Sequence, residues 1–293
     1  MNPSIAHRRA AFAERIRARE FTLAPGIFDF ISLRIADQVG FDALYLSGYA
    51  SIASNLGLPD AGLASYAEMV AMATKFAQST TTPIVADADT GFGDLLNIHH
   101  TVRGYERAGV CAIQLEDQEF PKKCGHTTGR RVVARAQMVR RIEIAVAARE
   151  DPNLLIVART DARTALGLEE AIARAIAYRA AGADVIFVES PETRGEFAAI
   201  GARVDAPLVA NMVESGRSPV LPKDELVALG FTLAIYPGTG MCAMAAALNF
   251  AFAALKEVGH SDGTRVPLAS LQTMHDITGF PAVWALEEKW QGD

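Results

Sequence analysis

One loop of this sequence combines residue types that can move a proton to or from carbon. Glu116 and Asp117 follow the apolar run 110–115, and Cys124 comes soon after them in the segment 122–126, which reads Lys-Lys-Cys-Gly-His. Neighbouring cations lower the pKa of a thiol and favour the thiolate, so we expect Cys124 to be titratable. A titratable thiol beside carboxylates that can bind a metal suggests proton transfer to a carbanion that a cation stabilises.

A second group of carboxylates follows the apolar run 83–86. Asp87 and Asp89 are two residues apart, so they point to the same side if the strand continues through them. With Glu116 they form an oxygen-only set, which favours Mg²⁺ or Mn²⁺ with water and substrate as further ligands. The competing interpretation is that both aspartates form turns or cap a helix. The presence of Glu116 and Cys124 favours the metal site.

Further polar residues end most of the other apolar runs. Tyr45, Ser47 and Gly48 end the second run, where hydroxyl groups and free backbone amides could hold a carboxylate. Arg159 has a planar fork that suits a substrate carboxylate, and it could at the same time form a salt bridge with Asp161. The full set of residues at the run ends is Asp29, Ser47, Asp87, Asp89, Glu116, Asp117, Arg159, Asp161, Glu189, Ser190, Asn211 and Pro237.

Eight short apolar runs alternate with helical patterns along the chain. The runs are nearly continuously apolar, as parallel strands buried on both faces are, and stretches such as 66–78 and 95–108 between them have helical periodicity. Eight such units predict a (β/α)8 barrel, with a doubly wound open sheet as the alternative. In a barrel, the C-terminal strand ends meet at the rim where active sites lie. The predicted strands are 22–27, 43–46, 83–86, 110–115, 154–158, 185–188, 207–210 and 233–236.

No linker or low-complexity segment divides the 293 residues, so we expect a single domain. Residues 1–20 are rich in arginine and alanine, and two glutamates among them favour an amphipathic helix over a transit peptide. The barrel is expected at 21–258. The remaining residues, 259–293, contain helix candidates at 268–277 and 281–290. The apolar side chains of this helical hairpin must be buried, and a neighbouring subunit is one place for them.

Composition and charge exclude several classes of partner. Half of the residues are hydrophobic and the net charge is −6, so no overall positive field attracts nucleic acid or anionic lipid. No apolar run is expected to reach the roughly 20 residues of a membrane helix. The three cysteines argue against a disulfide framework and fit a reducing compartment, and we expect Cys111 and Cys242 to be small buried residues. These features favour a cytoplasmic protein that acts on small molecules.

Several blocks of the sequence resemble, in the same order, the isocitrate lyase/phosphoenolpyruvate mutase superfamily. The segment 122–126 resembles the lyase branch, because the phosphonate mutases and hydrolases of the superfamily lack it. The segment 211–219 and the tail are more similar to the group of 2,3-dimethylmalate lyases, oxaloacetate hydrolases and petal-death proteins than to the 2-methylisocitrate lyases. The resemblance rests on residues 45–48, 56–60, 87–93, 122–126, 158–162 and 211–214.

The resemblance implies a barrel whose last helix is exchanged between the subunits of a homodimer or homotetramer. Mg²⁺, with Mn²⁺ as a substitute, would be bound by Asp87 and Asp89 with support from Glu116 and Asp60. The substrate, a di- or tricarboxylate or a 2-oxo acid, would contact Ser47, Gly48, Arg159, Glu189 and Asn211. The catalytic residues would be Cys124, Tyr45, His126 and Lys122. Cys124 would protonate the enolate, and Tyr45 would act as a base or orient the substrate.

These roles imply a Mg²⁺-dependent lyase that cleaves a carbon–carbon bond in an acid of the substituted malate or 2-methylisocitrate type. The products would be a 2-oxo acid and a carboxylate. Three alternatives stay open: an oxaloacetate acetylhydrolase that forms oxalate and acetate, a phosphonate enzyme like the mutases, and a barrel that binds oxo acids without turnover. The segment 236–240, Tyr-Pro-Gly-Thr-Gly, is smaller than the pocket wall expected there, which leaves the size of the substrate open.

Overall fold

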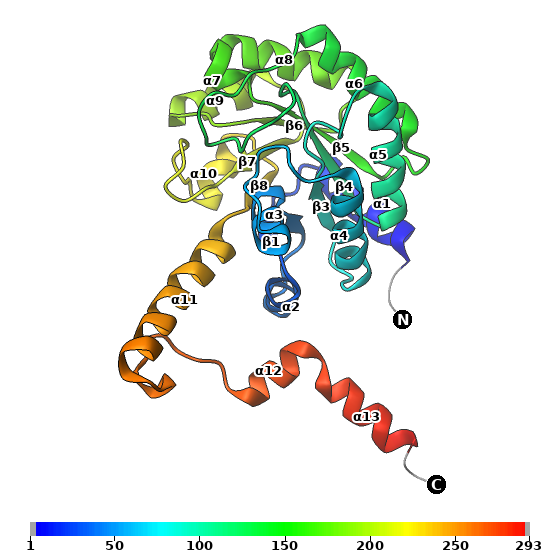
Figure 1. The fold of residues 1–293 in the computed structure, drawn as a ribbon. Coiled ribbons are helices and arrows are strands. Elements are labelled where there is room, and N and C mark those ends of the chain that lie inside the picture. The colour runs from blue at the N-terminus through cyan, green and yellow to red at the C-terminus, as the bar shows by residue number, and fades with distance from the viewer. Residues whose placement is uncertain (1–3, 291–293) are drawn as a thin grey trace.

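The computed structural model describes residues 4–290, and in it eight parallel strands close into a barrel in the order of the sequence (Figure 1). This confirms the predicted (β/α)8 fold and excludes the open, doubly wound sheet. The strands are β1 (Thr22–Ile27), β2 (Leu44–Leu46), β3 (Ile84–Asp87), β4 (Ala112–Glu116), β5 (Leu155–Thr160), β6 (Val185–Val188), β7 (Leu208–Asn211) and β8 (Leu233–Tyr236).

Helices follow the strands and cover the outside of the barrel (Figure 1). Local sequence signals set their ends: Ser65 and Glu68 form a capping box at the start of α4, and Gly40 and Gly109, with φ of 83° and 97°, end α2 and α5. The helices of this layer are α2 (Phe30–Val39), α3 (Gly48–Leu56), α4 (Tyr66–Gln78), α5 (Leu95–Ala108), α6 (Arg135–Ala148), α7 (Ala162–Leu166), α8 (Leu168–Ala180), α9 (Arg194–Arg203) and α10 (Lys223–Ala228).

The register of the strands brings polar residues from distant parts of the sequence together at one rim. Glu116 at the end of β4 pairs with Arg159 of β5, and Arg159 in turn pairs with Phe187 of β6. On the other side, Asp87 of β3 pairs with Gln114 of β4. Because all eight strands are parallel, these residues lie at the same C-terminal end of the barrel.

The opposite end of the barrel is closed by α1 (Ile5–Arg17). Phe12, Ala13 and Ile16 of this helix are buried and join the apolar cluster that fills the barrel interior. Arg8 and Arg9 fix the helix in place by donating to backbone carbonyls, including those of Gly109 at 3.0 Å and Val110 at 2.8 Å. The rim that carries the candidate residues is therefore the open end of the barrel.

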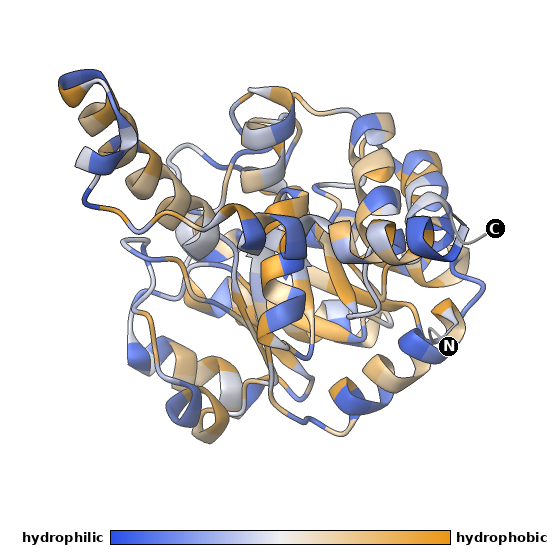
Figure 2. Ribbon diagram, turned by 90° about the horizontal axis from the view of Figure 1, so that it is seen from below, coloured by the Kyte–Doolittle hydropathy of each residue, from blue (hydrophilic) through white to orange (hydrophobic). Residues whose placement is uncertain are grey.

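The C-terminal helices leave the body of the barrel (Figure 1). They are α11 (Thr239–Val258), α12 (Leu271–Thr278) and α13 (Phe280–Trp290), with a short 3-10 turn at Ser261–Gly263 before α12. In the described chain, α12 contacts α2, whereas α11 and α13 have no buried residue. Figure 2 shows hydrophobic residues, in orange, on these outlying helices as well as in the strands. The outermost ends of the predicted N-terminal helix and C-terminal hairpin, residues 1–3 and 291–293, lie outside the described residues.

Two expectations fail in α11. The helix is long and apolar enough to cross a membrane by length and composition alone, so the expectation that no run reaches this length is wrong. The helix is rich in alanine, which is a good helix former. Its Phe250 and Phe252 side chains are each 62% exposed in the isolated chain. Cys242, expected to be buried, is exposed because α11 leaves the barrel at this point.

Candidate active site

A cavity of about 310 Å³ lies at the C-terminal rim of the barrel. The strand ends, three loops and the first turns of α3 and α11 supply its wall, which contains most of the candidate residues: Tyr45, Ser47, Asp60, Asp87, Cys124, His126, Arg159, Glu189 and Asn211. The other candidates do not line it but contact residues that do. Gly48 adjoins Asp87, the Asp89 amide donates to Asp87, Glu116 pairs with Arg159, and Lys122 pairs with Asp60.

Arg159 contacts three of the carboxylates at the rim. Its guanidinium donates to the two carboxylate oxygens of Asp161 at 3.0 and 2.9 Å. It also forms ion pairs with Glu116 at 3.2 Å and with Glu189 at 3.4 Å. Burial disfavours its charge, but these carboxylates raise the pKa of Arg159 well above its usual range. Arg159 is therefore a permanent, fixed cation that still faces the cavity.

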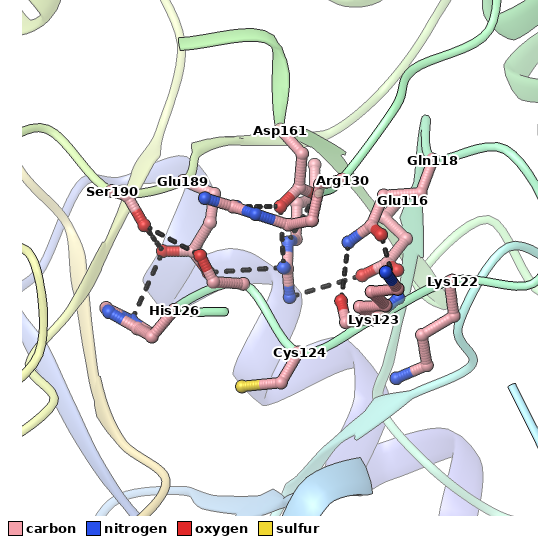
Figure 3. Close-up of polar contacts among 12 residues, drawn as sticks. Glu116, Gln118, Lys122, Lys123, Cys124, His126, Arg130, Asp161, Glu189 and Ser190 are labelled. Atoms are coloured by element: carbon pink, nitrogen blue, oxygen red, sulfur yellow. Dashed lines mark hydrogen bonds and ion pairs between the residues drawn. The ribbon is translucent and has the colours of Figure 1, made fainter. Parts of the chain in front are cut away.

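The Cys124 thiol lines the cavity, where burial raises its pKa by more than the nearby Arg159 guanidinium lowers it. Burial raises the pKa of Cys124 above its ordinary value, so the expected lowering by neighbouring cations is wrong. The reason is the position of Lys122, whose ammonium pairs with Asp60 and Asp89 instead. Figure 3 shows the Cys124 sulfur pointing away from Lys122. The thiol therefore keeps its proton at neutral pH, which is the form that a proton donor requires.

The loop that carries Cys124 is tied to the rim at several points. The backbone amide of Cys124 donates to the carbonyl of Asp60 at 3.3 Å, and the Ser190 hydroxyl donates to the carbonyl of Gly125 at 3.1 Å. Further along the loop, Arg130 donates to Asp161 at 2.6 Å. These contacts hold the thiol at the cavity, even though the segment has no regular secondary structure.

His126, Glu189 and Asn211 form a polar cluster on the same wall. The Asn211 amide donates to Oε2 of Glu189 at 3.0 Å, and Nε2 of His126 lies 3.5 Å from Oε1 of Glu189. The Arg217 amide donates to Nδ1 of His126 at 3.1 Å, so the neutral ring carries its proton on Nε2. Burial lowers the pKa of His126, which favours this neutral form. Within the described chain, Oδ1 of Asn211 is buried without a hydrogen bond and can accept one from a ligand.

Lys122 is buried behind the cavity wall. Its Nζ atom forms ion pairs with Asp60 and, at 2.7 Å, with Asp89. Burial lowers the pKa of Lys122, but Asp89, Glu116, Asp87 and Asp60 together raise it well above its usual value. Lys122 therefore holds the acidic loops together as a charged group and does not itself line the cavity.

The four carboxylates expected to bind a metal do not form a direct cage. Within residues 4–290, no three His, Cys, Asp or Glu side chains gather closely enough to ligate one ion. Asp87 faces the cavity, and behind it Oε1 of Glu116 is buried with no hydrogen bond from the described chain. Burial raises the pKa of Glu116, and raises that of Asp89 to about 7, so a nearby cation would stabilise both charged forms. This donor set fits a hydrated Mg²⁺ ion, which keeps several waters and binds one or two carboxylates.

Gln114 is a site residue that the sequence reasoning missed. Buried on β4, it accepts a hydrogen bond from the Tyr45 hydroxyl at 3.1 Å and donates to Oδ1 of Asp87 at 3.4 Å. Burial raises the pKa of Tyr45 well above its usual value, so the phenol is a donor at neutral pH. The available signal was a polar residue two positions before Glu116 in an apolar run, which places both on one strand face.

The start of α3 approaches Asp87 closely. Ser47 caps this helix by accepting a hydrogen bond from the Ala50 amide at 3.3 Å. A Cβ atom on Gly48 would lie 2.6 Å from Oδ2 of Asp87, so the approach requires glycine. Free amides at a helix N-terminus bind anions. Ser47 and Gly48 can therefore hold a carboxylate next to Asp87.

Two other residues at strand ends have structural roles. Asp117 accepts hydrogen bonds from the hydroxyls of Thr160 and Tyr178, both at 2.7 Å, and pairs with Arg174 of α8 at 3.0 Å. Asp29 caps α2. Neither residue lines the cavity.

The chain is similar to known proteins over most of its length. The family model described as phosphoenolpyruvate phosphomutase matches residues 12–256. The 2,3-dimethylmalate lyase of Eubacterium barkeri is 42% identical over 281 residues, which are 96% of this chain and 97% of that protein. The 2-methylisocitrate lyase of Aeropyrum pernix is 40% identical over 267 residues, which are 91% of this chain and 86% of that protein.

Solved structures show the same fold. An oxaloacetate acetylhydrolase in complex with 3,3-difluorooxalacetate superimposes with a TM-score of 0.91 at 32% identity, covering 98% of each chain. A phosphonopyruvate hydrolase in complex with oxalate and Mg²⁺ superimposes with a TM-score of 0.87 at 28% identity, covering 97% of this chain and 99% of that one. The similar proteins thus include lyases and hydrolases of small organic acids.

Proposed function

This chain belongs to the phosphoenolpyruvate mutase/isocitrate lyase superfamily, and we propose that it is a lyase that cleaves a carbon–carbon bond in a substituted 2-hydroxy dicarboxylate. The products are a 2-oxo acid and a second carboxylate. The observation that carries the proposal is the position of the Cys124 thiol in the same cavity as Arg159 and Asp87. This cavity thus combines a fixed cation, a carboxylate suited to a metal and an acid that can protonate a carbon atom.

Mg²⁺ is the proposed cofactor, and a related structure with bound Mg²⁺ and oxalate supports it. Asp87 would hold the ion from the cavity side, and Glu116, Asp89 and Asp60 would accept hydrogen bonds from its waters. When bound, the ion acts as a Lewis acid toward the oxygen atoms of the substrate and stabilises negative charge that develops on them. The ammonium of Lys122 keeps the carboxylates of Asp60 and Asp89 in place.

The 2-oxo acid portion of the substrate is proposed to lie between Arg159 and the start of α3. Its carboxylate would accept hydrogen bonds from the Arg159 guanidinium, the Ser47 hydroxyl and the free amides around Gly48. Asn211 and Glu189 would contact the remaining polar groups, and His126 would donate from Nε2. The neutral phenol of Tyr45 would orient the substrate as a donor, because its raised pKa disfavours a role as base.

Proton transfer from Cys124 completes the reaction. When the bond between the two substituted carbons breaks, the hydroxyl oxygen gives its proton to a water molecule and becomes the carbonyl of the 2-oxo acid. The electron pair of the broken bond passes to the second fragment as a carboxylate enolate. The Cys124 thiol then gives its proton to the enolate carbon and becomes a thiolate. General acid catalysis of this kind contributes roughly 10²–10⁴-fold to the rate.

Oxaloacetate hydrolysis is the second candidate, because an oxaloacetate acetylhydrolase is among the most similar solved structures. A coupled assay for 2-oxo acid release from substituted malates, 2-methylisocitrate and oxaloacetate, run in Mg²⁺, separates the two. Release of pyruvate or another 2-oxo acid from a 2-hydroxy acid supports the lyase. Formation of oxalate and acetate from oxaloacetate alone would replace it with the hydrolase, and phosphonate turnover would favour a mutase-like enzyme.

The exposed helices support an oligomer. Phe250 and Phe252 on α11 and Trp290 at the end of α13 present apolar surface that a second copy of the chain would cover. We propose a homodimer or homotetramer in which these helices are exchanged between subunits. Light scattering of the full chain tests this, and a monomer of 31.3 kDa at micromolar concentration would contradict it.

A further inference from the structure

One side of the cavity is built almost entirely from carbon and sulfur. Val213, Ile235, Pro237, Met241 and Cys242 line it, from the end of β7, the end of β8 and the first turn of α11. We call these five residues the apolar wall. None of the residues assigned above to carboxylate binding, metal binding or proton transfer belongs to it, so its chemistry is not explained by cleavage itself.

The cations near the cavity already form ion pairs with carboxylates of the chain. Among the described residues that line it, Arg159 is the side chain with a permanent positive charge, and it contacts Glu116, Asp161 and Glu189. The ammonium of Lys122 does not line the cavity and forms ion pairs with Asp60 and Asp89. The apolar wall therefore has no cation of its own for an additional carboxylate of the substrate.

A carboxylate borders the apolar wall and makes it still less suited to an anion. Glu214 lines the cavity, and its Oε1 atom accepts a hydrogen bond from the Thr239 hydroxyl at the start of α11. A Cβ atom on Gly238 would lie 3.9 Å from Oε2 of Glu214 and also 3.9 Å from Sγ of Cys242, so this carboxylate and the thiol flank the same point. A carboxylate brought there would meet a like charge.

We propose that the apolar wall and Glu214 together select the substrate class: alkyl-substituted dicarboxylates are cleaved, and tricarboxylates are rejected. The proposal rests on the lyase function proposed above. Met241 and Cys242 contact the alkyl substituent, while Glu214 repels the additional carboxylate of a tricarboxylate. Glu214 and Cys242 are exposed in the isolated chain, so water screens part of this repulsion. We expect kcat/KM for 2,3-dimethylmalate to exceed that for 2-methylisocitrate by at least about 10-fold, which is within the range that contacts in an apolar pocket supply.

The test compares kcat/KM for these two acids in the wild type and in variants of the wall. Cys242→Arg adds a cation and should improve 2-methylisocitrate cleavage relative to 2,3-dimethylmalate by about 10-fold or more, whereas Cys242→Met adds length without charge and should not. Glu214→Gln removes the like charge at constant shape and should shift the ratio in the same direction as Cys242→Arg. Because Glu214→Gln is a minimal change, it keeps the proposal testable if the arginine variant does not fold.

Two results would overturn the proposal: a wild type that cleaves both acids equally well, or a ratio that neither Cys242→Arg nor Glu214→Gln changes. Failure of the proposed lyase function has a different signature, because then neither 2,3-dimethylmalate nor 2-methylisocitrate is cleaved. In that case calorimetric titration of the same two acids in Mg²⁺ decides the matter. Tighter binding of 2,3-dimethylmalate in the wild type would support selection by the wall, and equal affinity would refute it.

Discussion

Gly125 lies directly against Arg159, with no room for a side chain between them. A Cβ atom on Gly125 would lie 2.5 Å from Nη2 of Arg159 and 2.6 Å from Oε2 of Glu189. Real Cβ atoms do not approach other atoms this closely, so the loop that carries Cys124 can reach the charged centre only with glycine here. This contact joins the thiol-bearing loop to the cation that is proposed to hold the substrate.

Gly125→Ala should therefore uncouple the loop from the site. We expect kcat/KM to fall about 100-fold, because a displacement of around 1 Å at a reacting group is enough for such a loss. The matched control is Gly195→Ala in α9, where a Cβ atom would meet only the Thr193 hydroxyl at 3.7 Å, an ordinary contact. Steady-state kinetics of both variants check this. Equal activity of the two would show that the close approach has no catalytic consequence.

Arg159→Lys tests the fixed cation. Lysine keeps the charge but loses the planar fork that contacts Asp161, Glu116 and Glu189. We expect a fall of about 100-fold in kcat/KM, with weaker binding of oxalate in calorimetry. Arg163→Lys is the control, because Arg163 pairs with Glu192 and Glu196 outside the cavity. Wild-type oxalate affinity in Arg159→Lys would contradict a role in holding the carboxylate.

The pH profile should reflect the buried thiol. Burial raises the pKa of Cys124, and the protonated thiol is the proposed acid. Activity in the cleavage direction should therefore persist above the ordinary thiol value of about 8.5 and be lost only as the pH rises through the higher pKa in the folded protein. A profile of kcat/KM against pH measures this limb. An alkaline limb below pH 8 would mean that the thiolate, or another group, controls the reaction.

Metal removal gives a prediction with two readouts. A chelator should abolish turnover, and Mg²⁺ or Mn²⁺ should restore it. Because the ion binds only the folded protein, Mg²⁺ at a hundredfold excess over Kd should also raise the free energy of unfolding by up to about 2.7 kcal/mol. This stabilisation should appear as a higher Tm. Asp87→Asn should remove the Tm response, whereas Asp262→Asn, on an exposed turn after α11, should leave it unchanged. Turnover that persists in the chelator would exclude the metal.

The fold could be predicted because local patterns determine it. Eight buried strands of parallel type, each followed by a helix, permit few arrangements, and consecutive pairing in a barrel places Glu116 beside Arg159. The clustering of Asp87, Arg159 and Glu189 at one rim followed from their positions at strand ends. The alternation of side chains along a strand was enough to predict where these residues lie.

The interior of the site could not be predicted in the same way, because long-range contacts decide it. Lys122 is next but one to Cys124 in sequence, yet its ammonium turns to Asp60 and Asp89, and the thiol is left in a buried, less charged setting. The link from Tyr45 through Gln114 depends on hydrogen bonds across strands. The polarity of a residue within an apolar run was the available signal, and sequence alone does not show its partner.

The most direct test of the central claim is the turnover of Cys124→Ser on the acid that the wild type cleaves best, measured in Mg²⁺ beside the thiol control Cys111→Ala. Serine keeps the shape of the side chain but is a far weaker acid than the thiol. We predict that kcat falls by about 10²–10⁴-fold in Cys124→Ser while the affinity for the 2-oxo acid product changes little, and that Cys111→Ala stays near the wild type. Full activity of Cys124→Ser would contradict the account, because some other group would then protonate the enolate.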